Sequence, residues 1–466
     1  MRHTLLRADY VVPMTPDNAV IVDGAVVIDT RGKIVAIGAG DMMQRDYPEA
    51  TARRLHDRLL MPGLINAHCH SGLLRGTAEG LPVWDWLQQF IDPMHRVLNA
   101  EEAEAASWLC YAEALLSGTT TIVDMWRFMD GSARAAQELG IRAVLVPYVG
   151  EHPDHDYFET LDTNEALIRQ WHGKANGRIQ TWVGLEHMFY AVPAAWERAV
   201  AITREYGVGL HTHSNESRFD VEETQRRYGM RPVEALEKFG LLDAHRVLLA
   251  HRVLLAHCVW LDDREIALLA GRGVGVTHNP VSNMKLASGA APVEKLLGAG
   301  VAVGLGSDGE KENNNLDVFE EMKVASLLAK LSKLDASALD SWSICRMATV
   351  MGARALGLER VTGSLEAGKS ADLIAVRTDT PRMTPLVTGP LLNLHHNLVH
   401  AVQGGDVALT MVDGRILVEN GELQTANLRT LIERVNRLTP GLFERRSQWL
   451  ASHGAVNALG RATASH

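Results

Sequence analysis

Short apolar runs alternate with helical stretches through the middle of the chain. The apolar runs are rich in β-branched residues and are bounded by turn-forming residues, which is typical of buried strands. We expect eight such strands, at residues 64–67, 119–125, 141–149, 178–186, 207–213, 252–257, 273–277 and 301–306. Helices are expected between them, for example at residues 101–117, 194–206, 264–270 and 316–330. This alternation predicts an α/β fold, a parallel (β/α)8 TIM barrel.

The two ends of the chain have a different pattern, with short strands and few helices. Residues 20–28 and 33–37 are β-branched runs separated by Gly and Asp. Similar runs return near the other end, at residues 372–376, 408–412 and 415–418. We therefore expect both ends to join in one small composite β-sandwich domain outside the barrel.

The length of the chain suits one barrel with an appended domain. Its 466 residues exceed an average domain, but barrels of this class are often larger than average. A helix is expected at residues 427–452, followed by an Ala- and Ser-rich tail. The predicted parts are the first half of the β domain, the barrel, the second half of the β domain, and the helix with its tail, at residues 1–60, 61–360, 361–425 and 426–466.

The charge balance restricts the class of partner. The chain has 56 acidic and 46 basic residues, a formal net charge of -10, and no block of Lys and Arg. An electrostatic basis for binding nucleic acid or an anionic membrane is therefore lacking. A small, neutral or weakly charged molecule is the expected partner.

Cysteine spacing and the N-terminal residues predict a cytoplasmic protein. The four cysteines are scattered, with no C-x-x-C pair, which argues against a disulfide framework or a structural zinc site. The first residues lack the apolar core of a signal peptide, and no run approaches the 18 apolar residues of a membrane span. We expect a soluble, intracellular protein.

One hexapeptide, His-Arg-Val-Leu-Leu-Ala, occurs at residues 245–250 and again at 251–256. It is far too short to be a solenoid repeat. An insertion of six residues preserves which side chains face the same side of a strand. Either His251 or His257 could therefore end the sixth barrel strand.

Histidines and acidic residues gather at the predicted C-terminal ends of the barrel strands. These ends converge on one face of a parallel barrel, where the active site lies. Because side chains alternate along a strand, His68 and His70 point the same way and can share one divalent ion. The strand-end residues are His68, His70, His211, His213, Glu216, His257, His278 and Asp308.

Asp308 and Glu216 are the acidic members of this group. Asp308 follows a buried strand, so its carboxylate needs a cation or donors, such as the backbone N–H groups of the next turn. With histidines facing it, a metal is the favoured partner. Glu216 follows His213 by three residues, which suits a proton carrier beside a metal, although a solvated loop glutamate is the simple alternative. His257 is expected to polarise the bond that is broken.

At these residues the sequence closely resembles the amidohydrolase superfamily. The resemblance covers residues 5–423, and its motifs are Pro-Gly-Leu-Ile-Asn-Ala-His-Cys-His at 62–70, Leu-His-Thr-His-Ser-Asn-Glu at 210–216, Gly-Ser-Asp-Gly at 306–309 and Gly-Ser-Leu-Glu-Ala-Gly-Lys-Ser-Ala-Asp at 363–372. The branch it resembles includes atrazine chlorohydrolase, guanine deaminase and the S-adenosylhomocysteine/methylthioadenosine deaminases. The resemblance implies that one metal is bound by His68, His70, His213 and Asp308.

The resemblance also implies further roles within the site. Glu216 would carry the proton, and His257 would contact the substrate, since the residues after it match the family. Binuclear relatives have a carbamylated lysine on the fourth strand, but residues 178–188 contain no lysine, so one ion is expected. Glu186 remains an alternative bridging carboxylate. The expected ion is Zn2+ or Co2+, with Mn2+ or Fe2+ as alternatives.

Two positions depart from the nucleoside deaminases that the sequence resembles. His95 stands where those enzymes hold ribose with a glutamate, and Pro147 stands where they use an arginine. We therefore expect a more apolar pocket near Trp84, with His187 and His278 as further wall residues. Molinate hydrolase and the phenylurea hydrolases are relatives whose neutral substrates would suit such a pocket.

These inferences favour a mononuclear hydrolase of a C–N or C–S bond in a small neutral substrate, such as a (thio)carbamate or urea-like compound. The alternative is a deaminase of a purine, pyrimidine, triazine or adenosine-type substrate. A non-enzymatic barrel is a third possibility, which the complete set of ligands argues against. We expect a homodimer or homotetramer. The predicted catalytic residues are Glu216, His257 and Asp308, and the predicted substrate contacts are Trp84, His95, His187 and His278.

Overall fold

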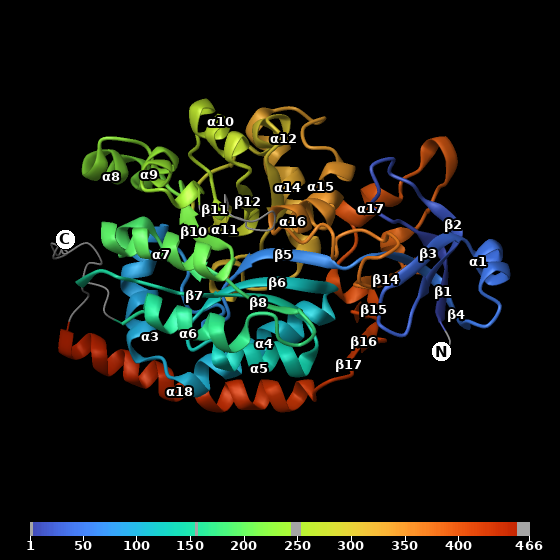
Figure 1. The fold of residues 1–466 in the computed structure, drawn as a ribbon, viewed down its shortest axis with the longest axis horizontal. Helices are drawn as coiled ribbons and strands as arrows, with labels where there is room; N and C mark the ends of the chain where they lie inside the picture. The colour runs from blue at the N-terminus through green and yellow to red at the C-terminus, as the bar shows by residue number, and fades with distance from the viewer. Residues whose placement is uncertain (1–2, 154–156, 244–252, 454–466) are drawn as a thin grey trace.

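The computed structural model describes residues 3–153, 157–243 and 253–453. Its centre is a barrel of parallel strands surrounded by helices (Figure 1). The barrel strands are β5 (Leu64–Cys69), β6 (Thr119–Trp126), β7 (Arg142–Pro147), β8 (Ile179–Thr181) with β9 (Val183–Gly184), β10 (Leu210–Ser214), β11 (Val253–His257), β12 (Gly275–His278) and β13 (Ala302–Leu305). The predicted (β/α)8 barrel is confirmed.

The barrel consists of two parallel sheets joined at two seams. Strands β5 to β8 form one sheet and β9 to β13 form the other. Segments β8 and β9 lie in the position of the fourth strand and are separated only by Trp182, whose N–H donates to the Leu145 carbonyl. At the other seam a Cβ added to Gly304 of β13 would lie 2.9 Å from the Ala67 Cβ of β5. Glycine therefore allows the last strand to approach the first.

Helices cover the outside of the barrel, and a helical segment lies between β5 and β6. That segment contains α2 (Val83–Trp86), a π-helical turn (Leu87–Ile91) and α3 (Asp92–Val97). The remaining barrel helices are α4 (Ala100–Leu116), α5 (Asp130–Leu139), α6 (Leu161–Trp171), α7 (Pro193–Tyr206), α8 (Arg218–Tyr228), α9 (Pro232–Lys238), α10 (Asp263–Arg272), α11 (Pro280–Lys285), α12 (Val293–Gly298), α13 (Glu310–Asn313), α14 (Val318–Lys333), α15 (Ser341–Met347) and α16 (Val350–Ala355).

The two ends of the chain form an eight-stranded sheet beside the barrel, as Figure 1 shows. Its strands are β1 (Thr4–Val11), β2 (Ile21–Ile28), β3 (Ile34–Ala39), β4 (Thr51–Pro62), β14 (Leu373–Arg377), β15 (Val407–Val412), β16 (Arg415–Glu419) and β17 (Glu422–Leu423). The antiparallel pair β4 and β14 joins the two ends, with Pro62 opposite Leu373. Because β4 leads through Gly63 into β5, the sheet and the barrel share a continuous chain.

Three further helices complete the fold: α1 (Gly40–Asp46), α17 (Leu394–His400) and α18 (Leu428–His453). Helix α18 runs along the outside of the barrel against α3 and α4 (Figure 1). There Arg445 makes an ion pair with the buried Glu102 carboxylate at 2.6 Å. None of the helices in the described ranges combines the length and apolar character that crossing a lipid bilayer requires.

A buried ion pair ties the small sheet to the barrel. The Nε of Arg142, at the start of β7, lies 2.9 Å from Oδ2 of Asp372, just before β14, and both side chains are buried. We expect Arg142→Met to lower the free energy of unfolding by about 3–5 kcal/mol, because it leaves a buried carboxylate without its cation. Chemical denaturation measures this. The control is Arg31→Met, whose exposed pair with Asp29 should contribute at most about 1 kcal/mol. Equal losses in the two variants would contradict the prediction.

Candidate active site

The ends of the barrel strands carry an unusual backbone. Asn215, His257 and Asp308 have φ values of 54°, 71° and 59°, in the left-handed region that few non-glycine residues adopt. Each residue lies at or just after the end of a strand, namely β10, β11 and β13. Such conformations collect at functional sites, where the surrounding packing maintains them. Here they accompany the turns that bring polar side chains over the barrel mouth.

His70 and His213 direct their Nε2 atoms toward each other. The Nδ1 of His70 lies 2.7 Å from the Met125 carbonyl oxygen, and the Nδ1 of His213 lies 2.6 Å from the Glu186 carbonyl oxygen. A carbonyl can only accept, so each Nδ1 carries the proton and each Nε2 presents a lone pair. The two Nε2 atoms are 3.3 Å apart. Two lone pairs therefore face each other without a proton between them.

His68 is oriented in the same way, through a second histidine. His211 Nδ1 donates to the Leu254 carbonyl at 2.9 Å, so its Nε2 accepts from His68 Nδ1 at 2.8 Å. The Nε2 of His68 is buried without a hydrogen-bond partner. It lies 3.4 Å from Oδ1 of Asp308. His211 thus fixes the tautomer that leaves the His68 lone pair free for a cation.

Asp308 completes the cluster. Its Oδ1 lies 3.3 Å from the Nε2 of His70 and accepts a hydrogen bond from the Gly309 N–H at 2.9 Å. Its Oδ2 accepts from the Ser282 hydroxyl at 2.7 Å. Burial alone would raise the pKa of Asp308, but the neighbouring imidazoles of His68, His257 and His70 hold this pKa well below its usual value. Asp308 therefore supplies a charged oxygen.

The cluster fits one divalent cation. Two overlapping groups have ligand atoms within 4.8 Å of one another: His68 with His213 and His257, and His68 with His70 and Asp308. Burial lowers the pKa of His68, His70 and His213, so these imidazoles stay neutral. Neutral imidazole nitrogens with one carboxylate oxygen are the donor set of catalytic zinc sites. The structure thus brings together all four residues predicted as ligands.

His257 belongs to this cluster, and Glu216 lies beside it. The Nδ1 of His257 contacts the Asn283 side-chain oxygen at 2.9 Å, and its Nε2 lies 3.7 Å from Oδ2 of Asp308. Glu216 Oε1 lies 3.8 Å from the Nδ1 of His257. Burial, with the negative charges of Asp220 and Asp308, raises the pKa of Glu216 well above its usual value. Glu216 can therefore hold a proton near neutral pH.

A cavity of about 30 Å³ lies against the cluster. His70, His213, Glu216, His257 and Asp308 line it. Its other walls include four apolar side chains, Val83, Trp86, Leu87 and Leu286. Three of these belong to the helical segment between β5 and β6. Apolar side chains therefore line this small cavity together with the polar cluster.

The four residues predicted as substrate contacts do not line this cavity. Trp84 donates its indole N–H to Ser217 and Asp220 at 3.0 and 3.1 Å, and its ring meets His187 edge-on. His95 packs among Trp126, Tyr148 and Phe158. Burial lowers the pKa of His278 to about 3, and its ring lies in the barrel wall. Their roles as substrate contacts remain predictions.

Several cavity residues were missed or assigned differently from the sequence. Tyr148 and Glu312 line the cavity, although neither was singled out. Glu312 belongs to a Glu-Lys-Glu run, which on its own indicates a solvated turn, yet it is buried and burial raises its pKa to about 8. Glu186, considered as a bridging ligand, lies 4.0 Å from the Nδ1 of His213, the nitrogen that faces away from the cluster.

Either His251 or His257 was expected to end the sixth barrel strand. His257 ends β11 and lies in the cluster. His251, with the first copy of the hexapeptide, lies outside the described residues. The prediction that placed His257 at the strand end agrees with this geometry.

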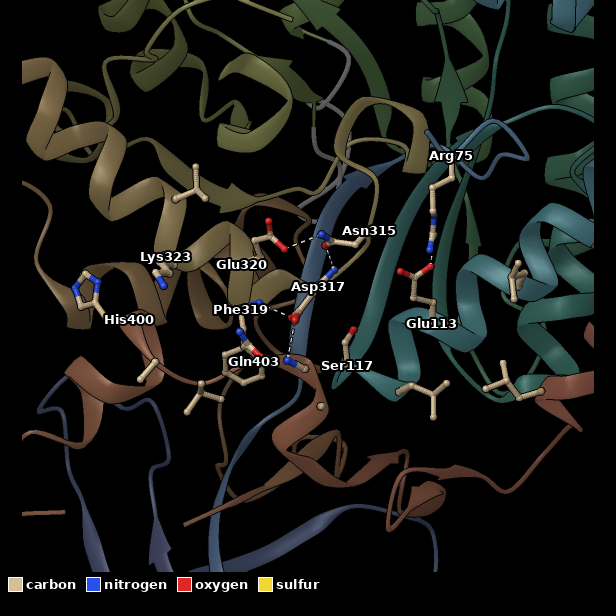
Figure 2. A pocket seen from close by; sticks show the side chains of 18 of the residues that line it. Arg75, Glu113, Ser117, Asn315, Asp317, Phe319, Glu320, Lys323, His400 and Gln403 are labelled. Atoms are coloured by element: carbon tan, nitrogen blue, oxygen red, sulfur yellow. Dashed lines mark hydrogen bonds and ion pairs between the residues drawn. The ribbon is translucent and has the colours of Figure 1, made fainter. Parts of the chain in front are cut away.

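A larger groove lies elsewhere on the molecule (Figure 2). It measures about 990 Å³, between α4, α14 and residues 400–405. Its labelled side chains pair mainly with their neighbours: Arg75 with Glu113, and Asp317 with the N–H groups of Phe319 and Gly404 (Figure 2). No member of the histidine cluster lines it. The histidine cluster therefore lies at the small cavity and not at this larger groove.

The barrel and its cluster together define a class of enzyme, the metal-dependent hydrolases that bind their ion at strand ends. The chain belongs to the amidohydrolase family, whose model matches residues 59–417. It is therefore an enzyme, a hydrolase acting on carbon–nitrogen bonds.

Similar proteins support this assignment over almost the whole chain. A 5-methylthioadenosine/S-adenosylhomocysteine deaminase of Desulforudis audaxviator is 37% identical over 445 residues, 94% of this chain and 99% of that protein. An adenosine deaminase of Xanthomonas campestris, solved with bound zinc, has a TM-score of 0.86 at 32% identity and covers 95% of this chain and 98% of its own. Atrazine chlorohydrolase of Arthrobacter aurescens, complexed with zinc, has a TM-score of 0.83 at 26% identity, with 94% and 100% covered. The branch that the sequence resembles is confirmed.

Proposed function

We propose that this chain is a metal-dependent deaminase that hydrolyses the exocyclic C–NH2 bond of an aminated N-heteroaromatic ring of the adenine type. The observation that carries the proposal is the convergence of His68, His70, His213 and Asp308 beside Glu216 at one cavity. Similarity to deaminases supports ring deamination over the hydrolysis of a (thio)carbamate or urea-like compound.

The site has the parts that this reaction needs. A divalent ion bound by the cluster would lower the pKa of a water molecule toward neutrality. Glu216 then accepts a proton from the attacking water and delivers it to the departing amine nitrogen. The new bond joins the water oxygen to the ring carbon, the C–N bond breaks, and ammonia leaves. His257, between Glu216 and Asp308, positions the reacting group against them.

A substrate panel tests the proposal. The zinc-loaded protein should release ammonia from at least one aminopurine, aminopyrimidine or aminotriazine with a kcat/KM of about 10⁴ M⁻¹s⁻¹ or more. Thiocarbamates and ureas should release no thiol or secondary amine. Coupled ammonia detection and mass spectrometry of the products make the measurement, with metal-free protein as the control. Release of thiol or secondary amine without ammonia would overturn the deaminase in favour of the alternative.

A further inference from the structure

Two buried glutamates that the mechanism does not use face the same cavity. Glu186 follows β9 in the fourth strand position, and Glu312 lies in α13, after the eighth strand β13. The fourth and eighth strands of a closed eight-stranded barrel lie on opposite sides. Both glutamates line the cavity that Glu216 lines. Two carboxyl groups, which follow strands on opposite sides of the barrel, therefore face the same cavity.

Each glutamate has one oxygen in use and one without a partner. Glu186 Oε1 accepts from the Tyr148 hydroxyl at 3.1 Å, and Glu312 Oε1 lies 3.0 Å from the Lys311 ammonium. The Oε2 atoms of both glutamates are buried without a hydrogen-bond partner. The side chains are only 6% and 5% exposed. Unpaired buried acceptors are uncommon in proteins, and those that line a cavity, as these two do, are able to accept hydrogen bonds from a molecule bound there.

The free oxygens are poorly placed to bind the metal. Neither glutamate belongs to the groups whose ligand atoms converge, within the part of the chain that the structure describes. The other oxygen of Glu186, Oε1, lies 4.0 Å from the protonated Nδ1 of His213, the nitrogen that faces away from the cluster. Asp308, whose pKa is held low, adds negative charge to the cavity wall, and the Lys311 ammonium already pairs with Glu312. The missing partners are therefore hydrogen-bond donors on a neutral or cationic molecule.

The apolar walls indicate what carries these donors. Trp86, Leu87 and Leu286 line the cavity together with the carboxylates. A planar ring packs against such walls and directs its N–H groups sideways, within its own plane. The unpaired Oε2 atoms of the two carboxyl groups can then each accept from one edge of the ring.

We propose that Glu186 and Glu312 determine substrate specificity by accepting hydrogen bonds from N–H groups on the two flanks of the reacting carbon. The preferred substrate is then an aromatic ring with N–H donors on both flanks, such as 2,6-diaminopurine, which has its 2-amino group on one side and an imidazole N–H on the other. This inference rests on the proposed deaminase function and names its substrate class. A site whose buried acceptors require donors discriminates strongly against analogues that lack them.

A matched pair of substrates tests the preference. 2,6-Diaminopurine differs from adenine by one added amino group, and 2,4-diaminopyrimidine differs from 4-aminopyrimidine in the same way. We expect the zinc-loaded enzyme to favour each diamino ring by at least about 10-fold in kcat/KM. Equal kcat/KM values within both pairs would overturn the inference, even if every ring is deaminated.

Glutamine variants assign the preference to the two residues. Glu186→Gln and Glu312→Gln should each lower kcat/KM for 2,6-diaminopurine by about 10- to 100-fold, mainly through KM. The control is Glu310→Gln, a buried neighbour on α13 that accepts from the Leu74 N–H and does not line the cavity. It should stay within about 2-fold of wild type. A loss in the control as large as in the other two, or the same loss for both purines in both variants, would indicate a structural effect and overturn the inference.

Binding measurements test the specificity role of the two glutamates independently of the proposed deaminase activity. In a Glu216→Gln background, which removes the proton carrier, calorimetry measures the affinity of 2,6-diaminopurine and adenine without turnover. We expect tighter binding of the diamino ring by about 10-fold, and loss of this difference when Glu312→Gln is added. Selective binding with no deamination of any ring by the parent enzyme would refute only the proposed function. Equal binding of the two purines would refute only the specificity role.

Discussion

Replacing Glu216 with glutamine is expected to lower kcat by about 10²–10⁴-fold while the protein keeps its full content of zinc. Glu216 lies 3.8 Å from His257 but belongs to neither group of converging ligand atoms. Burial raises its pKa, so near neutral pH the carboxyl group can both accept and release a proton. An amide of the same size can do neither. Steady-state kinetics and metal analysis of the same preparation measure the two effects.

An exposed glutamate nearby provides the control for this prediction. Glu222 lies on the outside of α8, and Glu222→Gln should leave both kcat and zinc content unchanged. Near-wild-type turnover in a Glu216→Gln protein that is fully loaded with zinc would show that another group carries the proton. A loss of zinc would instead show that Glu216 is a ligand. Either result would remove the assigned role.

The sequence was sufficient to predict site residues whose position depends on their neighbours along the chain. His68 and His70 are two residues apart at the end of β5, and the alternation of side chains along a strand puts both on one face. Asp308 could be predicted because a carboxylate directly after a buried strand requires a partner. The structure brings these residues together, with His213, as the strand pattern indicates. The barrel itself follows from the same alternation of strands and helices.

The sequence could not separate the roles of two histidines on β10. His211 and His213 are also two residues apart and share a face, so spacing alone does not show which one offers a lone pair to a metal. The distinction depends on the carbonyl that each Nδ1 meets, that of Leu254 on the next strand or that of Glu186 just after the preceding strand. Those partners are fixed only by the packing of neighbouring strands. Only the structure therefore shows that His211 orients His68.

The sequence also could not predict burial that depends on residues far away along the chain. Lys311 and Glu312 belong to a charged run that is typical of a solvated turn, yet they are buried. The rings of Trp86 and Trp126, far away in sequence, lie 5.9 and 5.8 Å from the Lys311 ammonium and help to enclose it. Conversely, Trp84 was expected at the substrate and instead donates its N–H to Asp220 and Ser217. Composition cannot show which of two tryptophans two residues apart, Trp84 or Trp86, faces the cavity.

Removing one metal ligand should abolish activity through the loss of the ion. In His213→Ala we expect less than a full equivalent of bound zinc and a fall in kcat of at least about 10³-fold, since an ion supplies several kcal/mol to such a reaction. The reason is geometric: the Nε2 atoms of His70 and His213 are 3.3 Å apart, with a lone pair on each, and the binding set loses one of its nitrogens. Metal analysis and kinetics at several zinc concentrations measure both effects.

A graded series of histidine variants makes this prediction sharper. His211→Asn should weaken zinc binding by about 10- to 100-fold without abolishing it, because His211 only fixes the tautomer of His68. Excess zinc should therefore restore the activity of His211→Asn but not that of His213→Ala. The exposed His56→Ala should match the wild type in both measurements. If zinc content and activity were the same in all three variants, the lone pairs that meet above the barrel would not bind a catalytic ion.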